Sequence, residues 1–565
     1  MSEPSELRPA RLAPVALRQV TERLGSFTTA WGWSAPGGEP AAVACTGITL
    51  DSRSVQPGDI YAALPGAHTH GARFVAQALE RGAVAVLTDP SGAELIEPAW
   101  REGREPELVP VLVVDDPRAQ LGAVSALVYG EPARELSMIG VTGTNGKTTT
   151  AYLVEAALRD AGRSTGLIGT VETRIGAERV ISVRTTPEAP DLHALLALMR
   201  ERGVTAVVVE VSSHALVLGR VDGIVFDVAA FTNLSHDHLD FHHDLDSYFQ
   251  AKAQLFTSRR SRAAVVCTDD SHGRRLAEQV RTAGQVPLTT VATSSPNAAI
   301  GTSTADDPSS HWMIGNVRAS RPPGTMVATL RGHHSGVAGS YPVQLDLHSP
   351  LPATFNVTNA ALALVCAVEV GIEPGTAAAG IASCAGVPGR MERVVGKGVG
   401  TDRGALDEDS APVGVVDYAH SPEAIATVLR SLQESTPGRL VVVLGAGGDR
   451  DRDKRPLMGA AAAEYGAVVV VTDDNPRSEP AELIRAAVRT GAEDTATRTG
   501  ATVLDVASRR GAIATAVSRA GPGDIVVVVG KGHEQGQEVA GVVHPFDDRA
   551  ALAAALSGED EAGQR

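Results

Sequence analysis

Cysteine is scarce in this chain. Its 565 residues include only four, Cys45, Cys267, Cys366 and Cys384, and no two of them form a CxxC pair. This excludes a disulfide framework and a zinc site built on cysteine pairs, and it fits a reducing compartment. The N-terminal stretch MSEPSELRPARLAPVALRQV lacks the apolar core of a signal peptide, and no apolar run reaches the length of a membrane span. We therefore expect a cytoplasmic protein without membrane insertion.

Positive charge is also in short supply. The chain has 50 Lys and Arg against 66 Asp and Glu, for a formal net charge of −16. A protein that binds nucleic acid by neutralising phosphates needs the opposite balance, so no nucleic-acid partner is expected. An anionic ligand would need a local cationic pocket instead. The length exceeds that of one domain and predicts two to four, of which three is our starting number.

Apolar runs alternate with helical stretches along most of the chain, as in parallel α/β sheets. Strands are predicted over 48–50, 59–64, 83–87, 109–114, 138–141, 206–211, 226–231, 263–267, 413–417, 440–444, 467–472 and 524–529, and helices over 72–81, 147–161 and 359–370. Breaks in the pattern divide the chain into three domains, 1–136, 137–390 and 391–565. Residues 294–324, rich in Ser, Gly and Pro, are expected to be irregular, and 398–412 to be a flexible excursion between paired strands.

The most specific local signal is a glycine-rich turn between a predicted strand and a predicted helix. It consists of Gly143, Thr144, Asn145, Gly146, Lys147, Thr148 and Thr149. Glycines let backbone N–H groups approach a polyphosphate, Lys147 can neutralise it, and Thr148 can hold Mg²⁺. Val141 stands where the usual P-loop spacing has a glycine. The turn predicts binding of ATP or GTP but does not separate a kinase, an ATPase motor and a ligase.

Acidic and histidine side chains follow downstream. Glu210 ends a predicted strand, where it is either a Mg²⁺ ligand or a carboxylate that caps a turn. Ser212 and Ser213 beside His214 do not indicate a serine hydrolase, because the GxSxG motif is missing. Four histidines occur within His236–His243, without HExxH or paired-cysteine spacing. One histidine at a magnesium site is a simpler interpretation than a zinc site.

Nine motifs occur in order: GTNGKTTT, EVSSHAL, FTNLSHDHLDFH, FNVTNA, GRMERV, VDYAHSPE, GGDRDRDKRPLMG, DDNPR and GKGHE. With this set the chain resembles the Mur ligases from about residue 45 to 550. The resemblance implies an N-terminal domain for the UDP end of a substrate, a central P-loop ATPase-type domain and a C-terminal Rossmann-like domain for an amino acid. It implies a monomer that uses ATP to activate the γ-carboxylate of UDP-N-acetylmuramoyl-L-Ala-D-Glu as an acyl phosphate, which an amine then attacks during peptidoglycan synthesis.

The resemblance also implies roles for individual residues. Those implied for catalysis are Lys147, Glu210, His238 and Lys252, and those for the Mg²⁺ shell are Thr148, Glu210, His238 and Lys252, the lysine as a carbamate. Added CO₂ would convert this cation into an anion that can bind a metal. For ATP, the turn from Gly143 to Thr149 is joined by Asn356, Arg390 and Asp417. Because Asp417 comes from the third domain, domain closure would be part of catalysis.

Two further sets concern the other substrates. The set implied for the UDP substrate is Leu50, Ser52, Ala67, His68, Thr69, Arg184, Thr185, Thr186, Ser212 and Arg220. The set implied for diaminopimelate is Arg450, Asp474, Asn475, Pro476, Arg477, Gly530 and Glu534. Arg220 could clamp a peptide carboxylate. DNPR is similar to the signature of relatives that add diaminopimelate rather than lysine, since an arginine fork recognises the extra carboxylate, and Glu534 would accept the distal ammonium.

Three positions depart from the family pattern: Leu218 replaces a glutamine of some relatives, His236 a common arginine, and His420-Ser421-Pro422 the usual HTP. None removes a catalytic group. Three alternatives stay open. A folylpolyglutamate synthase-like ligase shares the fold and the acyl-phosphate chemistry, a silent binding relative would have lost catalysis, and a P-loop kinase would form ADP without any amine. DNPR and the UDP-site pattern favour the cell-wall enzyme, and the intact Lys147 and Lys252 argue against a silent relative.

Overall fold

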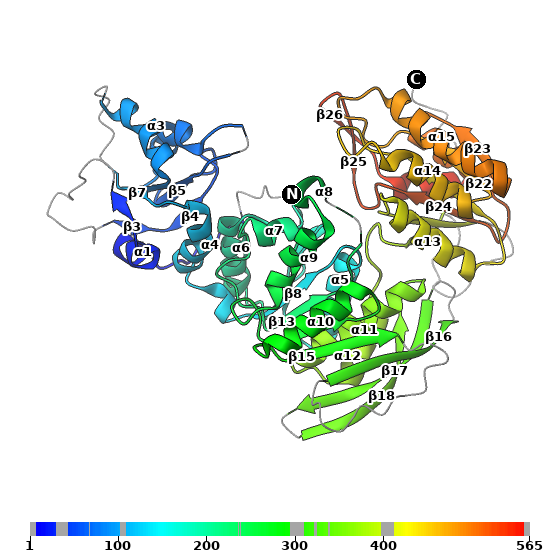
Figure 1. Ribbon diagram of the computed structural model, residues 1–565, viewed down its shortest axis with the longest axis horizontal. Coiled ribbons are helices and arrows are strands. Elements are labelled where there is room, and N and C mark those ends of the chain that lie inside the picture. Colours follow the sequence, from blue (N-terminus) through cyan, green and yellow to red (C-terminus); the bar gives the residue numbers. More distant parts are fainter. Residues whose placement is uncertain are drawn as a thin grey trace.

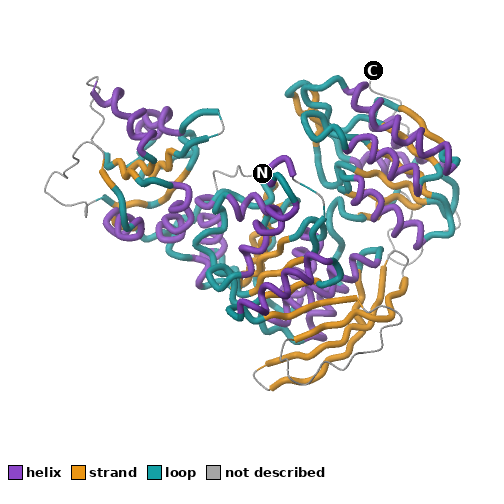
Figure 2. The backbone as a smooth tube through the Cα atoms, in the orientation of Figure 1, coloured by secondary structure: helices purple, strands orange, loops and turns teal. Residues whose placement is uncertain are grey.

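Short runs of Val, Ile and Ala form the buried parallel strands of this protein, and helices cover both faces of its sheets. A computed structural model describes residues 7–29, 43–66, 68–101, 109–182, 184–235, 237, 239–293, 310–320, 325–336, 339–396 and 412–558. These residues form three α/β units in chain order, with the central unit between the other two (Figure 1). Strands lie between layers of helix in each unit, except at the residue 310–349 edge of the central sheet, where helices cover one face only (Figure 2). The expected α/β fold class is confirmed, and the three domain limits stay a prediction.

The N-terminal unit is built on a five-stranded sheet of order β2-β7-β6-β5-β4, parallel except for β2. Its strands are β2 (Thr28–Thr29), β4 (Gly47–Thr49), β5 (Asp59–Ala63), β6 (Ala85–Thr88) and β7 (Val111–Val113), and β1 (Val15–Ala16) pairs with β3 (Ala44–Cys45) beside it. Its helices are α1 (Leu17–Leu24), η4 (Gly71–Phe74), α2 (Val75–Glu80), α3 (Pro90–Arg101), α4 (Pro117–Val128) and η5 (Pro132–Arg134). Ahead of β1, Arg8 donates two hydrogen bonds, of 2.8 and 2.7 Å, to the buried carboxylate of Asp59.

The central unit holds an eleven-stranded sheet of order β11-β10-β9-β12-β8-β13-β14-β15-β16-β17-β18. Its parallel strands are β8 (Ser137–Thr142), β9 (Thr165–Ile168), β12 (Ala206–Glu210), β13 (Val228–Phe231), β14 (Ala264–Cys267), β15 (Leu288–Thr293) and β16 (Ser310–Ser320). Antiparallel strands extend both edges: β10 (Glu172–Ile175), β11 (Glu178–Ile181), β17 (Thr325–Gly336) and β18 (Gly339–Ser349). The glycine-rich turn follows β8, in the middle of this sheet.

Helices cover the two faces of the central sheet and form two separate cores. One core contains α5 (Lys147–Asp160), α11 (Thr354–Glu369) and α12 (Pro374–Ala382). The other contains α6 (Ala189–Glu201), α7 (Ser213–Val217), α9 (Leu245–Ala253), η6 (Gln254–Phe256) and α10 (Ser271–Ala283), and the short α8 (Leu239–His242) lies beside α9. Helix α6 also packs against α4 and joins the central unit to the N-terminal one.

The expectation of an irregular segment over 294–324 is wrong for residues 310–320, which form β16. This strand pairs parallel with β15 and antiparallel with β17. Alternate side chains on it, Trp312 and Ile314, are buried in the core under α11. The Ser- and Pro-rich flanks hid this alternation, and those flanks, 294–309 and 321–324, lie outside the described residues.

The C-terminal unit is a six-stranded sheet of order β19-β20-β24-β21-β22-β23, in which only β19 is antiparallel. Its strands are β19 (Glu392–Val394), β20 (Val413–Asp417), β21 (Leu440–Leu444), β22 (Val468–Val471), β23 (Thr502–Asp505) and β24 (Ile525–Val529), followed by the hairpin of β25 (Gly536–Val539) and β26 (Val542–Pro545). Its helices are α13 (Pro422–Ser435), α14 (Lys454–Tyr465), α15 (Ala481–Thr499), α16 (Arg509–Arg519) and α17 (Asp548–Leu556).

Strands β19 and β20 pair with each other, as expected of the strands that flank the 398–412 excursion. Of that segment only Pro412 is described, so the excursion itself lies outside the described residues. Within the described part of the chain, every helix is too short or too polar to span a bilayer.

Candidate active site

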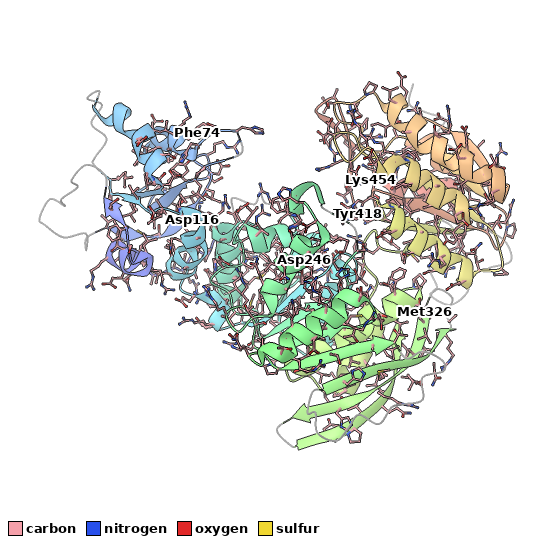
Figure 3. The ribbon with its side chains drawn as sticks, viewed as in Figure 1. Phe74, Asp116, Asp246, Met326, Tyr418 and Lys454 are labelled. Atoms are coloured by element: carbon pink, nitrogen blue, oxygen red, sulfur yellow. The ribbon has the colours of Figure 1, made fainter. Side chains whose placement is uncertain are left out.

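A cavity of about 650 Å³ lies where the central unit meets the C-terminal unit. The glycine-rich turn, the start of α11 and the segment after β14 line it from the central unit. The segment Asp417–Ser421, directly after β20, lines it from the C-terminal unit. Tyr418 and Lys454 lie on the side of that unit that faces the central one (Figure 3). Polar side chains at the carboxyl ends of parallel strands are thereby brought together from two sheets.

Two glycines of the turn are required by its geometry. Gly143 has φ +145°, and a Cβ there would lie 1.9 Å from Thr232 Oγ1. Gly146 has φ +85°, and its Cβ would lie 2.4 Å from Asn359 Oδ1. The ammonium of Lys147, directly after Gly146, folds back and donates to the backbone carbonyls of Gly143 (3.0 Å) and Thr144 (2.8 Å). Burial lowers the pKa of Lys147, while the Glu210 carboxylate opposes this shift.

Glu210, at the end of β12, is fully buried and surrounded by hydrogen-bond donors. Its carboxylate accepts from Thr148 Oγ1 at 2.8 Å, from the Thr170 N–H at 2.8 Å and from Thr170 Oγ1 at 3.1 Å. A hydroxyl and a carboxylate this close are hard oxygen donors of the kind that Mg²⁺ prefers. His238 lies outside the described residues, among which no group of three His, Cys, Asp or Glu side chains could hold a metal.

Lys252, on α9, is buried beside the turn, with 1% of its surface exposed. Its ammonium donates to the Gly143 carbonyl at 2.8 Å and lies 4.4 Å from the centre of the Tyr248 ring. Burial holds the pKa of Lys252 well below its usual value, and the nearby Lys147 cation lowers it further. Both effects favour the neutral amine over the ammonium, and the neutral amine is the form that reacts with electrophiles such as CO₂.

Asn356, Arg390 and Asp417 all line the same cavity. Asp417 accepts from the backbone N–H groups of Met391 (2.7 Å) and Ala419 (2.8 Å), and burial raises the pKa of its carboxyl. The Arg390 guanidinium stacks 4.4 Å from the Tyr418 ring and donates to Thr148 Oγ1 at 3.4 Å. These contacts connect the phosphate turn to the C-terminal unit.

The residues expected to bind the UDP substrate fall into two groups. Thr185 and Ser212 line the cavity, and Thr186 donates to the Glu210 carbonyl at 2.7 Å. Arg184 and Arg220 both pair with the Glu188 carboxylate, at 2.6 and 2.8 Å. The others, Leu50, Ser52, His68 and Thr69, belong to the N-terminal unit and do not line the cavity, and Ala67 lies outside the described residues.

The residues expected to bind diaminopimelate gather around the buried ammonium of Lys531. This ammonium donates to Asn475 Oδ1 at 2.8 Å and to Glu534 Oε2 at 3.2 Å, and it lies 3.6 Å from Asp474 Oδ1. Gly530 has φ +115°, and a Cβ there would lie 2.7 Å from Asp474 Oδ2. The structure therefore brings Asp474, Asn475, Gly530 and Glu534 into one network.

Arg477 and Arg450 lie on two loops that contact each other. Arg477 has φ +51°, donates to the Gly448 carbonyl at 2.7 Å and pairs with Glu538 at 3.3 Å. Pro476 is buried against Gly448, where a Cβ would lie 1.9 Å from the Pro476 carbonyl oxygen, and Arg450 is exposed. The Glu479 carboxylate joins the loops by accepting from Arg455 at 2.7 and 3.1 Å and from the Asp449 N–H at 2.6 Å.

Sequence reasoning missed several residues of these networks: Thr170, Tyr248, Lys531 and Glu479. Lys531 stands inside the motif GKGHE, so its position in that motif could have indicated a role. Thr170 and Tyr248 stand outside any assigned pattern, and only the fold brings them to the site.

Three models of the Mur ligase family match successive parts of the chain: "Mur ligase family, catalytic domain" over residues 44–129, "Mur ligase middle domain" over 141–367 and "Mur ligase, glutamate ligase domain" over 389–532. The UDP-N-acetylmuramoyl-L-alanyl-D-glutamate–2,6-diaminopimelate ligase of Streptomyces coelicolor is 49% identical over 98% of this chain and 99% of its own. The protein of the same name from Streptomyces avermitilis is 50% identical with the same coverage. A solved structure of a ligase with this name is 29% identical, covers 97% of this chain and 99% of its own, and has a TM-score of 0.60.

Proposed function

Because the chain belongs to the Mur ligase family, we propose that it is an ATP-dependent ligase that adds a diaminopimelate to UDP-N-acetylmuramoyl-L-Ala-D-Glu during peptidoglycan synthesis in the cytoplasm, as a monomer. The observation that carries this proposal is the shared cavity, in which the phosphate turn faces Asp417–Ser421 of the C-terminal unit. A ligase needs such a meeting point, because a carboxylate activated on one side must encounter an amine held on the other.

The reaction would proceed in two steps. A γ-carboxylate oxygen of the D-glutamyl residue attacks the γ-phosphorus of ATP, the bond to the β-phosphate oxygen breaks, and ADP leaves. The diaminopimelate amine then attacks the acyl phosphate carbon, a C–N bond forms, inorganic phosphate leaves, and the nitrogen loses a proton. Two anions must approach each other in the first step, and the Lys147 cation offsets their repulsion.

The site fits a magnesium ion held by Thr148 and Glu210, whose oxygens lie 2.8 Å apart. His238, which lies outside the described residues, would be a further ligand. When bound, the ion would screen the phosphate oxygens and polarise the γ-phosphorus. Lys252 would serve as a carbamate. Its burial beside the turn supports this, because burial favours the neutral amine that reacts with CO₂. The charge of the nearby Lys147, which disfavours an ammonium at Lys252, would favour a carbamate anion there.

ATP would be held by Gly143, Thr144, Asn145, Gly146, Lys147, Thr148 and Thr149 together with Asn356, Arg390 and Asp417, all but Gly143 in the lining of the cavity. The stack of Arg390 on Tyr418 spans the two units, so closure of the C-terminal unit would complete the site.

The UDP substrate would extend from Leu50, Ser52, Ala67, His68 and Thr69 of the N-terminal unit toward Arg184, Thr185, Thr186, Ser212 and Arg220. Arg184 and Arg220 share the Glu188 carboxylate in this structure. A substrate carboxylate would compete with Glu188 for these guanidinium groups. The two arginines could therefore bind the substrate from the positions they already have.

Diaminopimelate would be recognised by Arg450, Asp474, Asn475, Pro476, Arg477, Gly530 and Glu534. Arg477 is 24% exposed and lies beside the Lys531 network, where a guanidinium can pair with the distal carboxylate. Lysine lacks that carboxylate and would leave the arginine without its partner.

The test is ATP-dependent phosphate release with UDP-N-acetylmuramoyl-L-Ala-D-Glu and either meso-diaminopimelate, LL-diaminopimelate, L-lysine or no amino acid, with the nucleotide product weighed by mass spectrometry. The proposal predicts release and the tripeptide mass with at least one diaminopimelate isomer. A preference for lysine would overturn the assignment of the amino acid. Release without any amine would favour a kinase, and inactivity with all four would favour the folate-type ligase or a silent relative.

A further inference from the structure

The turn between β9 and β10 places Thr170 against the Glu210 carboxylate. The Thr170 N–H donates to Oε1 at 2.8 Å, and its hydroxyl lies 3.1 Å from Oε2. Gly169, just before it, approaches so closely that a Cβ would lie 2.2 Å from Glu210 Oε1. Because no larger residue fits there, the backbone of this turn is built to contact the carboxylate.

The same hydroxyl also lies 3.0 Å from the hydroxyl of Thr185. A carboxylate only accepts, so the one hydroxyl hydrogen of Thr170 goes to Glu210, and Thr185 must donate to Thr170. Glu210 receives a further hydrogen from Thr148, in the phosphate turn, at 2.8 Å. A continuous chain of hydrogen bonds therefore runs from Thr148 through Glu210 and Thr170 to Thr185.

The three threonines of this hydrogen-bond chain face the cavity, and only the Glu210 carboxylate is shielded from water. Thr148, Thr170 and Thr185 line the cavity, while Glu210 is fully buried. The Thr148 end belongs to the turn proposed to bind ATP, and the Thr185 end to the segment proposed to bind the UDP substrate. These hydrogen bonds thus connect the proposed sites of two anionic ligands directly.

The turn that carries Thr170 is held from behind. Arg174 of β10 donates to Glu172 at 2.6 Å and to the buried Glu155 of α5 at 3.1 Å. Tyr152 of α5 donates to the same Glu172 at 2.9 Å. Since α5 begins at the phosphate turn, these contacts fix the hairpin relative to the nucleotide end of the site.

We propose that Thr170 is a positioning residue that couples nucleotide binding to binding of the UDP-dipeptide. This inference rests on the proposed function. The Mg²⁺ that accompanies the nucleotide would be held by the Glu210 carboxylate. The Thr170 hydrogen would then be free to turn toward Thr185, and Thr185 would offer its own hydrogen to an anionic group of the substrate. Nucleotide binding thereby tightens binding of the dipeptide, and by linkage the dipeptide tightens binding of the nucleotide to the same extent.

The experiment measures the Kd of UDP-N-acetylmuramoyl-L-Ala-D-Glu by calorimetry, with and without a non-hydrolysable ATP analogue and Mg²⁺. We expect the nucleotide to tighten wild-type binding about fivefold or more, the low end of measured coupling. Thr170→Val removes the hydroxyl at nearly constant volume and should bring the ratio of the two Kd values close to one. Thr170→Ser keeps the hydroxyl and should keep the ratio.

The matched control is Thr173→Val, in the same hairpin. Thr173 is buried, whereas Thr170 is half-buried, and the Thr173 hydroxyl hydrogen-bonds to that of Ser182 at 3.1 Å instead of to Glu210. This variant should keep the wild-type ratio. Thermal unfolding checks each variant, and Thr170→Ala replaces the valine variant if the latter does not fold.

A wild-type ratio that persists without the Thr170 hydroxyl, or a wild-type ratio of one, would overturn the coupling while leaving the proposed function intact. Failure of the wild type to bind the dipeptide both with and without the nucleotide would overturn the proposed function and the coupling together.

Discussion

Replacing Arg477 with alanine tests the basis of amino-acid selection. Its guanidinium is 24% exposed, donates to the Gly448 carbonyl at 2.7 Å and pairs with the 39% exposed Glu538 at 3.3 Å. Truncating one member of a buried, hydrogen-bonded charge pair costs about 2–5 kcal/mol. Because this side chain is partly exposed, we take the lower end of that range, about 2 kcal/mol, which corresponds to a rise of roughly 30-fold in the KM for diaminopimelate.

The assay is phosphate release at varied diaminopimelate concentration, with ATP and the UDP-dipeptide saturating. The KM values for ATP and the dipeptide should not change, because Arg477 does not line the nucleotide cavity. Arg489→Ala is the control, since Arg489 pairs with Asp505 in the same unit outside the expected pocket. L-Lysine has no distal carboxylate, so any turnover with lysine should be the same in the variant. An unchanged KM for diaminopimelate, or an equal loss with lysine, would refute the role of Arg477.

Three further predictions concern Glu479, His193 and Arg8. Glu479→Gln should raise the KM for diaminopimelate about tenfold and leave the KM for ATP unchanged, because it weakens the contact that joins the two binding loops and so misplaces the binding groups. Asp524→Asn removes an ion pair in the same unit and should leave both KM values unchanged. Burial lowers the pKa of His193 from 6.5 to about 4 in the folded protein. Between these two pH values the imidazole is protonated only in the unfolded chain, so the free energy of unfolding should decrease as the pH falls from 6.5 toward 4. At pH 5 the loss of unfolding free energy amounts to about 2 kcal/mol. The melting temperature of His193→Gln should therefore fall less than that of the wild type between pH 7 and 5. Arg8→Ala leaves the buried Asp59 carboxylate unpaired and should lower the free energy of unfolding by about 3 kcal/mol in urea titrations, whereas an unchanged value would show that the pair contributes nothing.

The sequence predicted best where its apolar runs have sharp ends. The strands at 413–417 and 440–444 match β20 and β21 at both ends, since each is a short run of mostly Val and Leu that stops at Asp or Gly. Strand β16 was missed because its inward Trp312 and Ile314 alternate with polar residues between Ser- and Pro-rich flanks. Helix α11 begins at Thr354, five residues before the expected start at Asn359, after a residue with φ +80° that no sequence pattern indicates.

Part of the site could be predicted from the positions at which the predicted strands end. Glu210 ends β12, and Thr148 lies in the helix that follows the adjacent parallel strand β8, so both stand where the carboxyl ends of these strands meet at one edge of the sheet. Thr170 could not be predicted, because its role depends on a turn that folds back onto a carboxylate 40 positions away. Lys531 likewise acquires its partner Asn475 across 56 positions. Such long-range contacts follow from packing and not from local spacing.

The most direct test of the acyl-phosphate mechanism is to follow a labelled carboxylate oxygen through the reaction. UDP-N-acetylmuramoyl-L-Ala-D-Glu labelled with ¹⁸O in the γ-carboxylate is incubated with ATP, Mg²⁺ and the preferred diaminopimelate isomer. We expect the tripeptide mass together with inorganic phosphate that carries one labelled oxygen, since the carboxylate oxygen that attacks the γ-phosphorus leaves with it. Tripeptide formation with unlabelled phosphate would contradict the acyl-phosphate step, and labelled phosphate without tripeptide would contradict the assignment of a diaminopimelate-adding ligase.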